Sequence, residues 1–169
     1  MDRKKLAAFA LLSAIFLVYS PPQARAEQVW QLPLAHPKLM HEYVQPVSDY
    51  GAGHRGVDYL AEEGLEVFAA SDGEVSFTGR VVDRFIVTLS HPGTTKTSYE
   101  PVCSDLAVGD EVSAGEVIGK VCSYPGYKSH CGALTCLHFS MRRAGGYLSP
   151  LAVIGGLEPS RLIPVQALG

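Results

Sequence analysis

Short apolar runs, rather than long amphipathic ones, dominate the middle of this chain. Between about residues 64 and 142, segments rich in β-branched and aromatic residues are separated by Gly, Asp and Pro. No window of about 11 residues in the chain beyond residue 26 keeps the 3.6-residue apolar period of a helix. Six segments have the length and composition of β-strands: 66–70, 74–77, 85–90, 96–99, 116–121 and 137–142. The pattern predicts a nearly all-β domain.

Turn signals punctuate these segments. Asp72-Gly73 is a dipeptide typical of tight hairpins, so we expect the segments 66–70 and 74–77 to pair with each other. Pro92 cannot continue a central strand, because it lacks a backbone N–H. We therefore interpret His91, which precedes it, as a turn residue.

The first 26 residues have the pattern of a cleaved secretory signal. A positively charged start is followed by an apolar run from Leu6 to Tyr19, two prolines and the sequence Ala24-Arg25-Ala26. A membrane anchor is the alternative, but a span needs about 18 or more apolar residues. We expect export, with Glu27 as the new N-terminus.

The rest of the chain divides around one core. Residues 27–46 contain three prolines and no repeat, so we predict an irregular lead-in, in which His36 and His41 are interpreted as surface imidazoles. Residues 47–152 form the predicted domain, and residues 153–169 a C-terminal tail. The apolar fraction of 47% in 169 residues is ample for one buried core.

The charge balance excludes one class of partner. The chain has 14 basic and 17 acidic residues, a formal net charge of −3, and its Lys and Arg residues are scattered beyond residue 25. Nucleic-acid binding through bulk positive charge needs a basic cluster. We therefore expect no nucleic-acid partner.

Four cysteines follow the predicted signal: Cys103, Cys122, Cys131 and Cys136. An even number in an exported chain indicates two disulfides, for which three connectivities are open. We favour Cys103–Cys122 with Cys131–Cys136. A four-thiolate zinc site is the alternative, but the chain has no Cys-x2-Cys pair.

Two histidine contexts could carry chemistry. In Gly53-His54-Arg55-Gly56-Val57-Asp58, an imidazole and a carboxylate lie four positions apart in a glycine-flanked segment, and both are zinc donors. The alternative is an exposed loop histidine beside a turn-capping aspartate. In the predicted strand 137–142, alternation directs His138 away from the core, on the same face as Cys136 and Ser140. A cross-strand histidine with a purely structural role is the alternative there.

Together the two contexts resemble a known family. GHRGVD, followed some eighty residues later by CLHFSMRR, resembles the motifs of the lysostaphin-like zinc metallopeptidases that cut peptidoglycan peptides. The intervening VFAASDGEVSFTGRV, IVTLSHPGTTKTSYEPV and VGDEVSAGEVIGKV are similar to the family's catalytic domain in order and spacing. The similarity covers about residues 30–152. It is greatest to short exported actinobacterial members, which share YEPV and the final Tyr147 to Leu151 segment.

The resemblance implies a fold, a metal and an activity. The fold is a compact, sandwich-like antiparallel sheet of the duplicated hybrid motif type. The metal is Zn2+ held by His54, Asp58 and His138, with a fourth coordination position open. The activity is that of an exported, cell-wall-associated zinc endopeptidase acting on peptidoglycan cross-link peptides. We expect a monomer with no membrane partner after signal removal.

Two departures from the family pattern leave the activity open. Cys136 replaces the first histidine of the family's His-x-His motif, and Pro101 replaces the histidine of its Tyr-x-His-Leu segment. The alternative is a noncatalytic module that binds peptidoglycan or regulates hydrolases. A biotinyl or lipoyl carrier, suggested by VGDEVSAGEVIGKV, would need a lysine displayed at a tight turn, and the sequence has none in such a setting.

We predict that His130 replaces the missing imidazoles as the catalytic acid or base. If Cys131 is bonded to Cys136, their Cα atoms lie about 5.5 Å apart, and His130 is one residue further. The bridge would then tether His130 at the rim of the zinc site. An exposed loop histidine beside a structural disulfide is the alternative.

Overall fold

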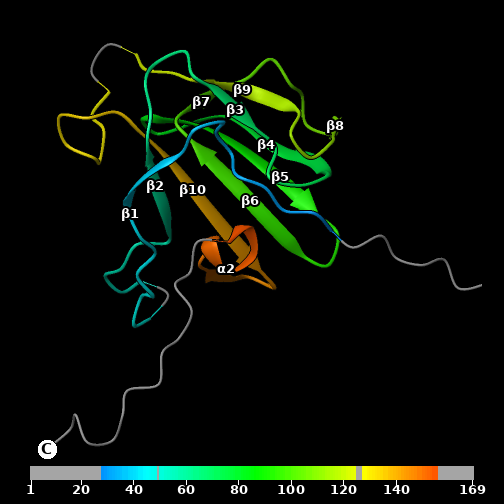
Figure 1. Cartoon of the computed structure of the whole chain (residues 1–169), viewed down its shortest axis with the longest axis horizontal. Coiled ribbons are helices and arrows are strands. Elements are labelled where there is room, and N and C mark those ends of the chain that lie inside the picture. Colours follow the sequence, from blue (N-terminus) through cyan, green and yellow to red (C-terminus); the bar gives the residue numbers. More distant parts are fainter. Residues whose placement is uncertain (1–27, 49, 125–126, 156–169) are drawn as a thin grey trace, which may run out of the picture.

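The computed structural model describes residues 28–48, 50–124 and 127–155, and these form two antiparallel β-sheets (Figure 1). The predicted signal at 1–26 and residues 156–169 of the predicted tail (153–169) lie outside the described residues, whereas residues 153 and 154 of that tail are helical. The large sheet has the order β1-β2-β10-β6-β5-β4-β8, with β11 also paired to β10. Its strands are β1 (Lys38–His41), β2 (Gly56–Leu60), β10 (Cys136–Arg143), β6 (Thr95–Glu100), β5 (Arg84–His91), β4 (Gly73–Val81), β8 (Glu111–Val112) and β11 (Gly146–Leu148).

The small sheet has three strands in the order β3-β9-β7. They are β3 (Glu66–Phe68), β9 (Val117–Val121) and β7 (Val102–Cys103), and a single turn of helix, α2 (Leu151–Ile154), follows β11. Among the described residues, no helix is long and apolar enough to cross a membrane.

The core is a cluster of apolar side chains to which both sheets contribute. Strand alternation explains its composition, because every second side chain of a strand points to the same face. In β10, Leu137 and Phe139 are fully buried while His138 and Ser140 are half-buried on the opposite face. The Phe139 ring packs 5.1 Å from that of Tyr99 on the neighbouring β6. One face of the large sheet therefore belongs to the core and leaves the other face for a polar site.

The predicted fold class is confirmed. The described residues are nearly all β, and each of the six predicted strand segments contains a strand. The fit is closest at 116–121, because β9 begins one residue later than predicted and ends at the predicted residue. The segment 74–77 is only the first half of the nine-residue β4.

The predicted hairpin at Asp72-Gly73 is wrong. β3 and β4 lie in different sheets, so this segment is a crossing between sheets. The Asp72 carboxylate accepts a hydrogen bond from the backbone N–H of Ala114 at 2.7 Å, which holds it against the loop between β8 and β9. Gly73 is required for a close approach rather than a hairpin turn, because a Cβ there would lie 2.8 Å from Nδ1 of His91.

His91 is also not the turn residue that we expected. It is the last residue of β5 and only 6% exposed. Its Nδ1 donates to the carbonyl oxygen of Asp72 at 2.7 Å, and its Nε2 lies 2.7 Å from Oγ1 of Thr97. Burial lowers the pKa of His91, against the opposing effect of the Asp72 carbonyl.

The predicted irregular lead-in contains one strand. β1 pairs antiparallel with β2 and forms an edge of the large sheet, with Leu39 opposite Tyr59 and His41 opposite Asp58. The rest of the segment joins the core, where Leu34 is 2% exposed. The lead-in is therefore an integral part of the sheet that carries Asp58.

The two disulfides have the connectivity that we favoured. Cys103–Cys122 joins the small sheet to the segment after β9, with 5.6 Å between the Cα atoms. Cys131–Cys136 ties the loop before β10 to its first residue, with a Cα separation of 6.2 Å.

Candidate metal centre

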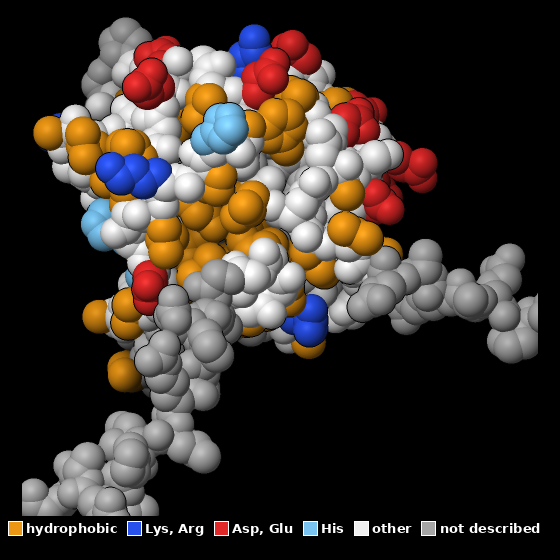
Figure 2. Space-filling model, in the orientation of Figure 1, with side chains coloured by type: hydrophobic (Ala, Val, Ile, Leu, Met, Phe, Trp, Pro, Cys, Tyr) orange, Lys and Arg blue, Asp and Glu red, His pale blue; other side chains and the backbone are white. Residues whose placement is uncertain are grey.

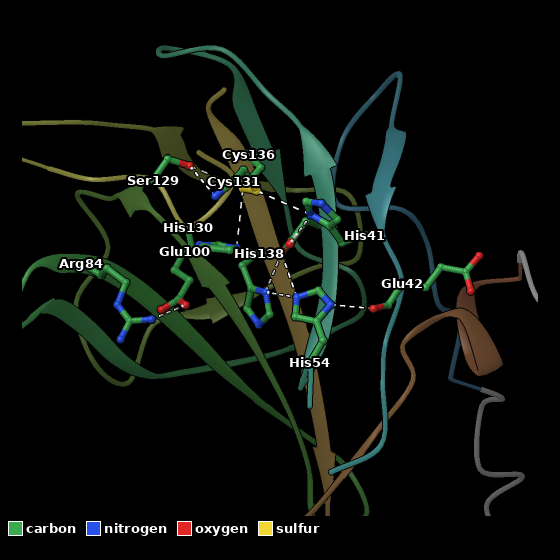
Figure 3. Close-up of polar contacts among 11 residues, drawn as sticks. His41, Glu42, His54, Arg84, Glu100, Ser129, His130, Cys131, Cys136 and His138 are labelled. Atoms are coloured by element: carbon green, nitrogen blue, oxygen red, sulfur yellow. Dashed lines mark hydrogen bonds and ion pairs between the residues drawn. A yellow bond between two sulfur atoms is a disulfide. The ribbon is translucent and has the colours of Figure 1, made fainter. Parts of the chain in front are cut away.

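A row of polar side chains crosses four strands of the large sheet. His41 on β1 is opposite Asp58 on β2, Asp58 is opposite His138 on β10, and His138 is opposite Glu100 on β6. Val57 and Tyr59 face the core, so Asp58 between them points to the opposite face of the sheet. Its side chain is nevertheless only 2% exposed. Buried carboxylates need compensating partners. The Asp58 carboxylate lies 2.7–3.1 Å from four imidazole nitrogens. They belong to His41, His54, His130 and His138, which are labelled in Figure 3.

The sequence-predicted ligands converge on one carboxylate oxygen. Oδ1 of Asp58 lies 3.1 Å from Nε2 of His54 and 2.7 Å from Nδ1 of His138. The two imidazole nitrogens are 3.2 Å apart. In a tetrahedral zinc site with bonds of about 2.0–2.1 Å, ligand atoms are separated by about 3.3 Å. The three donor atoms are therefore spaced as zinc ligands are.

The orientation of His54 supports a cation between these atoms. Its Nδ1 lies 2.6 Å from the backbone carbonyl of Glu42, an acceptor, so Nδ1 carries the proton. In the neutral ring Nε2 then presents a lone pair to the Asp58 carboxylate. Two acceptors at 3.1 Å need a proton or a metal ion between them.

Gly56 makes room for this arrangement. A Cβ at Gly56 would lie 2.7 Å from Nε2 of His138, closer than side chains approach. The glycine that we expected to bend a loop instead lies in β2, where the absence of a side chain leaves room for the ring of His138, the third predicted ligand. Asp58 likewise belongs to a regular strand, and His54 is held by a bridge to Val44.

His130 joins the same cluster from the loop before β10. Its Nε2 lies 3.0 Å from Oδ1 of Asp58 and 3.6 Å from Sγ of Cys136. The side chain is 39% exposed, so it also faces solvent. The two nearby sulfurs are bonded to each other and offer no thiolate. The structure thus brings together all four residues singled out from the sequence, and their chemical roles stay predictions.

Two further residues of the cluster were missed. His41 is 55% exposed as a surface imidazole would be, yet its Nδ1 lies 3.0 Å from Oδ2 of Asp58. Only the pairing of β1 with β2 reveals this contact. Glu100 accepts a hydrogen bond from Arg84 at 3.0 Å beside the centre. Successive side chains of a strand point to opposite faces, and Tyr99 faces the core. The sequence could therefore have assigned Glu100 to the polar face.

The electrostatics favour an ionised carboxylate at the centre. Burial by itself raises the pKa of Asp58, but the hydrogen bonds with His130 and His138 outweigh burial and hold that pKa well below its usual range. The hydrogen bond to Asp58 conversely raises the pKa of His130, against burial. A negative charge is thereby fixed next to nitrogen donors, which suits a divalent cation.

The centre opens into a groove of about 600 Å³ on the polar face of the large sheet. His54, His130 and His138 line one part of it, and hydroxyl groups of Ser140 and Ser98 lie further along. A groove of this size, with convergent polar groups, is what a peptide or other small ligand occupies.

Comparison with known proteins places the chain in a family. Residues 52–150 match Peptidase family M23. An uncharacterized protein of Mycobacterium tuberculosis, Rv2891, is 36% identical over 138 residues, which cover 79% of this chain and 53% of that protein. A Mycobacterium bovis protein, Mb2915, matches to the same extent. The chain spans about half the length of the curated relatives it matches.

Solved structures share the fold. The catalytic domain of the antimicrobial peptidase lysostaphin from Staphylococcus simulans superposes with a TM-score of 0.59 at 23% identity, covering 71% of this chain and 93% of that domain. The SpoIIQ-SpoIIIAH pore forming complex contains a chain with a TM-score of 0.63 at 18% identity, covering 75% and 91%.

Proposed function

Because the chain belongs to Peptidase family M23, with a lysostaphin-like domain, we propose that it is a zinc endopeptidase that hydrolyses the peptide cross-links of bacterial peptidoglycan. We further propose that it is exported through the signal pattern at residues 1–26 and acts in the cell wall as a monomer. The family membership supports a peptidase or a homologue of one. The bond that is cut is part of the proposal.

The observation that carries the proposal is the convergence of three donor atoms at the end of a groove. Nε2 of His54, Oδ1 of Asp58 and Nδ1 of His138 lie 2.7–3.2 Å from one another. Three protein donors with one open position is the arrangement of catalytic zinc, whereas structural zinc has four protein donors. Zinc held here would supply Lewis acidity toward the scissile carbonyl and activate a water molecule.

The protein residues divide the remaining tasks. The Glu42 carbonyl holds the His54 ring so that Nε2 faces the ligand position, and Gly56 leaves space for the His138 ring. The buried carboxylate of Asp58 supplies negative charge. These neighbouring groups thus help to maintain the site for the ion.

His130 is the proton-transfer group in this proposal. It lies within hydrogen-bond reach of a ligand atom, faces the groove, and is tethered by the Cys131–Cys136 bridge. Such a group can take a proton from the attacking water and return it to the leaving amine. Cys136 cannot do this, because it is buried and disulfide-bonded.

A noncatalytic role is the second candidate. Cys136 and Pro101 replace two histidines of the family pattern, and a component of a pore forming complex shares this fold. In that case the chain would bind peptidoglycan or regulate a hydrolase without cutting. Zinc binding alone does not separate the two candidates.

The test is digestion of purified peptidoglycan by the mature protein, with and without a zinc chelator, followed by detection of new amino termini. We expect cleavage that the chelator stops and added zinc restores. His54→Ala, Asp58→Ala and His138→Ala should each abolish stoichiometric zinc binding, because too few donors remain.

His36→Ala is the matched control, since it removes an exposed imidazole outside the cluster. It should keep both zinc and cleavage. Full zinc occupancy in the His138 variant would disprove the site. Zinc binding without chelator-sensitive cleavage of any cross-link type would establish the noncatalytic candidate.

A further inference from the structure

The groove floor has a regular chemical order. Three cross-strand pairs of β10 and β6 line it in succession: His138 with Glu100, Ser140 with Ser98, and Arg142 with Lys96. The two strands lie side by side in the middle of the large sheet (Figure 1). The floor therefore passes from the metal centre, through a row of hydroxyls, to a cationic end.

An aromatic ring holds the arginine of the cationic end in place. The Arg142 guanidinium lies 5.5 Å from the centre of the Tyr147 ring, and Arg55 approaches the same ring at 5.8 Å. Tyr147 lies opposite Arg142 on β11, and its carbonyl accepts a hydrogen bond from Tyr43. Stacking on an aromatic ring restricts an arginine side chain while leaving its N–H groups available.

Arg142 and Lys96 have no carboxylate partner among the described residues. Arg84, in contrast, is bound to Glu100 at 3.0 Å. The groove lining contains four basic side chains and one acidic one, although the whole chain is net acidic. On the face seen in Figure 2, acidic side chains instead gather at the upper right edge, where Figure 1 places β8.

The spacing fits an extended peptide. Arg142 is four positions after His138 on β10, and a strand rises about 3.3 Å per residue, so the cationic end is about 13 Å from the metal centre. A peptide lying along β10 covers that length with about four residues. The intervening hydroxyls of Ser140, Ser98 and Thr88 can bond its backbone.

We propose that Arg142 and Lys96 bind a free carboxylate of the substrate peptide, about four residues from the bond at the metal centre. The inference rests on the proposed peptidase function and names the substrate class, a peptide with a free carboxylate at that distance. Arginine pairs with carboxylates through two parallel N–H···O bonds, which gives both affinity and register. The carboxylate therefore determines which peptides are cut.

The test compares two forms of one probe on the zinc-loaded protein. The probe is a cross-linked peptide released from peptidoglycan, with its carboxylates free or converted to amides. We expect the wild type to prefer the free form through a lower KM. Arg142→Gln and Lys96→Gln should each reduce kcat/KM on the free form about 10- to 100-fold, the effect of one charge-assisted hydrogen bond, and leave the amide form nearly unchanged.

Lys120→Gln is the matched control, because Lys120 is an exposed lysine on β9 of the small sheet. It should alter neither form, and Arg142→Lys should recover part of the preference. Equal losses on both forms in Arg142→Gln, or equal cleavage of both forms by the wild type, would overturn the inference.

If the wild type cuts neither form, the peptidase function fails and the inference is decided by binding. Fluorescence anisotropy of labelled probes then measures the affinity of each form for the wild type and for Arg142→Gln. A preference for the free form that Arg142→Gln removes supports the carboxylate site. Equal affinities for both forms refute it.

Discussion

The two faces of the large sheet carry histidines in opposite circumstances. On the inner face, His91 belongs to a hydrogen-bond network. Its Nδ1 donates to the Asp72 carbonyl, its Nε2 is hydrogen-bonded to the Thr97 hydroxyl, and that hydroxyl is hydrogen-bonded to the Tyr99 hydroxyl at 3.0 Å. Each group has a complementary partner within the protein. Such a network fixes structure and has no vacancy for a ligand.

The outer face leaves its histidines incompletely satisfied. Three imidazole nitrogens lie 2.7–3.1 Å from Oδ1 of Asp58, and the lone pair on Nε2 of His54 faces that oxygen. An ion would relieve this arrangement, whereas the groups of the His91 network already have partners in the protein. The comparison teaches that a functional histidine is distinguished by unmatched donors and acceptors, since burial and a nearby carboxylate occur in structural sites as well.

The largest effect that we expect concerns the outer face. His130→Ala should reduce peptidoglycan hydrolysis by about 10²–10⁴-fold, the usual contribution of a general acid or base. Zinc content should stay unchanged, and both quantities can be measured on one preparation. If zinc is lost with activity, His130 is a fourth ligand. Hydrolysis at the wild-type rate would show that His130 has no role.

The next prediction contrasts adjacent residues on the two faces. Phe139→Ala should lower the free energy of unfolding by about 3–5 kcal/mol, because Phe139 is fully buried against Tyr99. Ser140→Ala, one residue away on the groove face, should change it by less than about 0.5 kcal/mol. Denaturant unfolding measures both. Similar losses in the two variants would refute the separation of the faces.

Local patterns sufficed for the inner face and for part of the centre. Alternation in 137–142 assigned His138 to the face away from the core, because burial of one sheet face dictates a period of two, and the structure buries Phe139 on the core face. The spaced GHRGVD and CLHFSMRR motifs identified His54, Asp58 and His138 as candidates. Each motif is local in the sequence, but only their joint resemblance to the metallopeptidase family implied one shared zinc site.

The errors came from pairing between distant segments. Asp72-Gly73 has the composition of a hairpin, yet β4 pairs with β5 and β8, and the close approach of His91 is what requires the glycine. The contact of His41 with Asp58 depends on the register of β1 against β2. The hydrophobic period of a single segment specifies neither the strand with which it pairs, nor the register of that pairing, nor the sheet to which it belongs.

The two disulfides should separate stability from activity. Replacing Cys103 and Cys122 by serine should lower the free energy of unfolding by about 3 kcal/mol, because the bridge closes a loop of about 20 residues. Replacing Cys131 and Cys136 opens a much shorter loop, with an expected loss of about 2 kcal/mol. Only the second pair should also impair hydrolysis, since it tethers His130.

Denaturant unfolding and peptidoglycan digestion on both double variants provide the measurement. Zinc content serves as a control, because neither bridge includes one of the three predicted ligands. Wild-type hydrolysis by the Cys131/Cys136 variant would show that the bridge does not position His130.

The smallest effect is a pH dependence that originates on the inner face. Because burial lowers the pKa of His91, the unfolded chain binds a proton at this residue more readily than the folded protein does. The contribution of His91 to the free energy of unfolding is therefore complete above about pH 6.5, the ordinary pKa of histidine. It is lost as the pH falls below that value, with a slope of at most about 1.4 kcal/mol per pH unit.

His91→Gln removes the titration, so the wild-type free energy of unfolding should fall more steeply than that of the variant between pH 7.5 and 5. Chelator in all samples removes any effect of bound metal, and His36→Gln is the control for the loss of an exposed imidazole. The histidines of the outer face are the same in the wild type and in His91→Gln, so they do not contribute to the difference between the two profiles. Parallel pH profiles for the wild type and His91→Gln would show that the buried network does not exclude the proton.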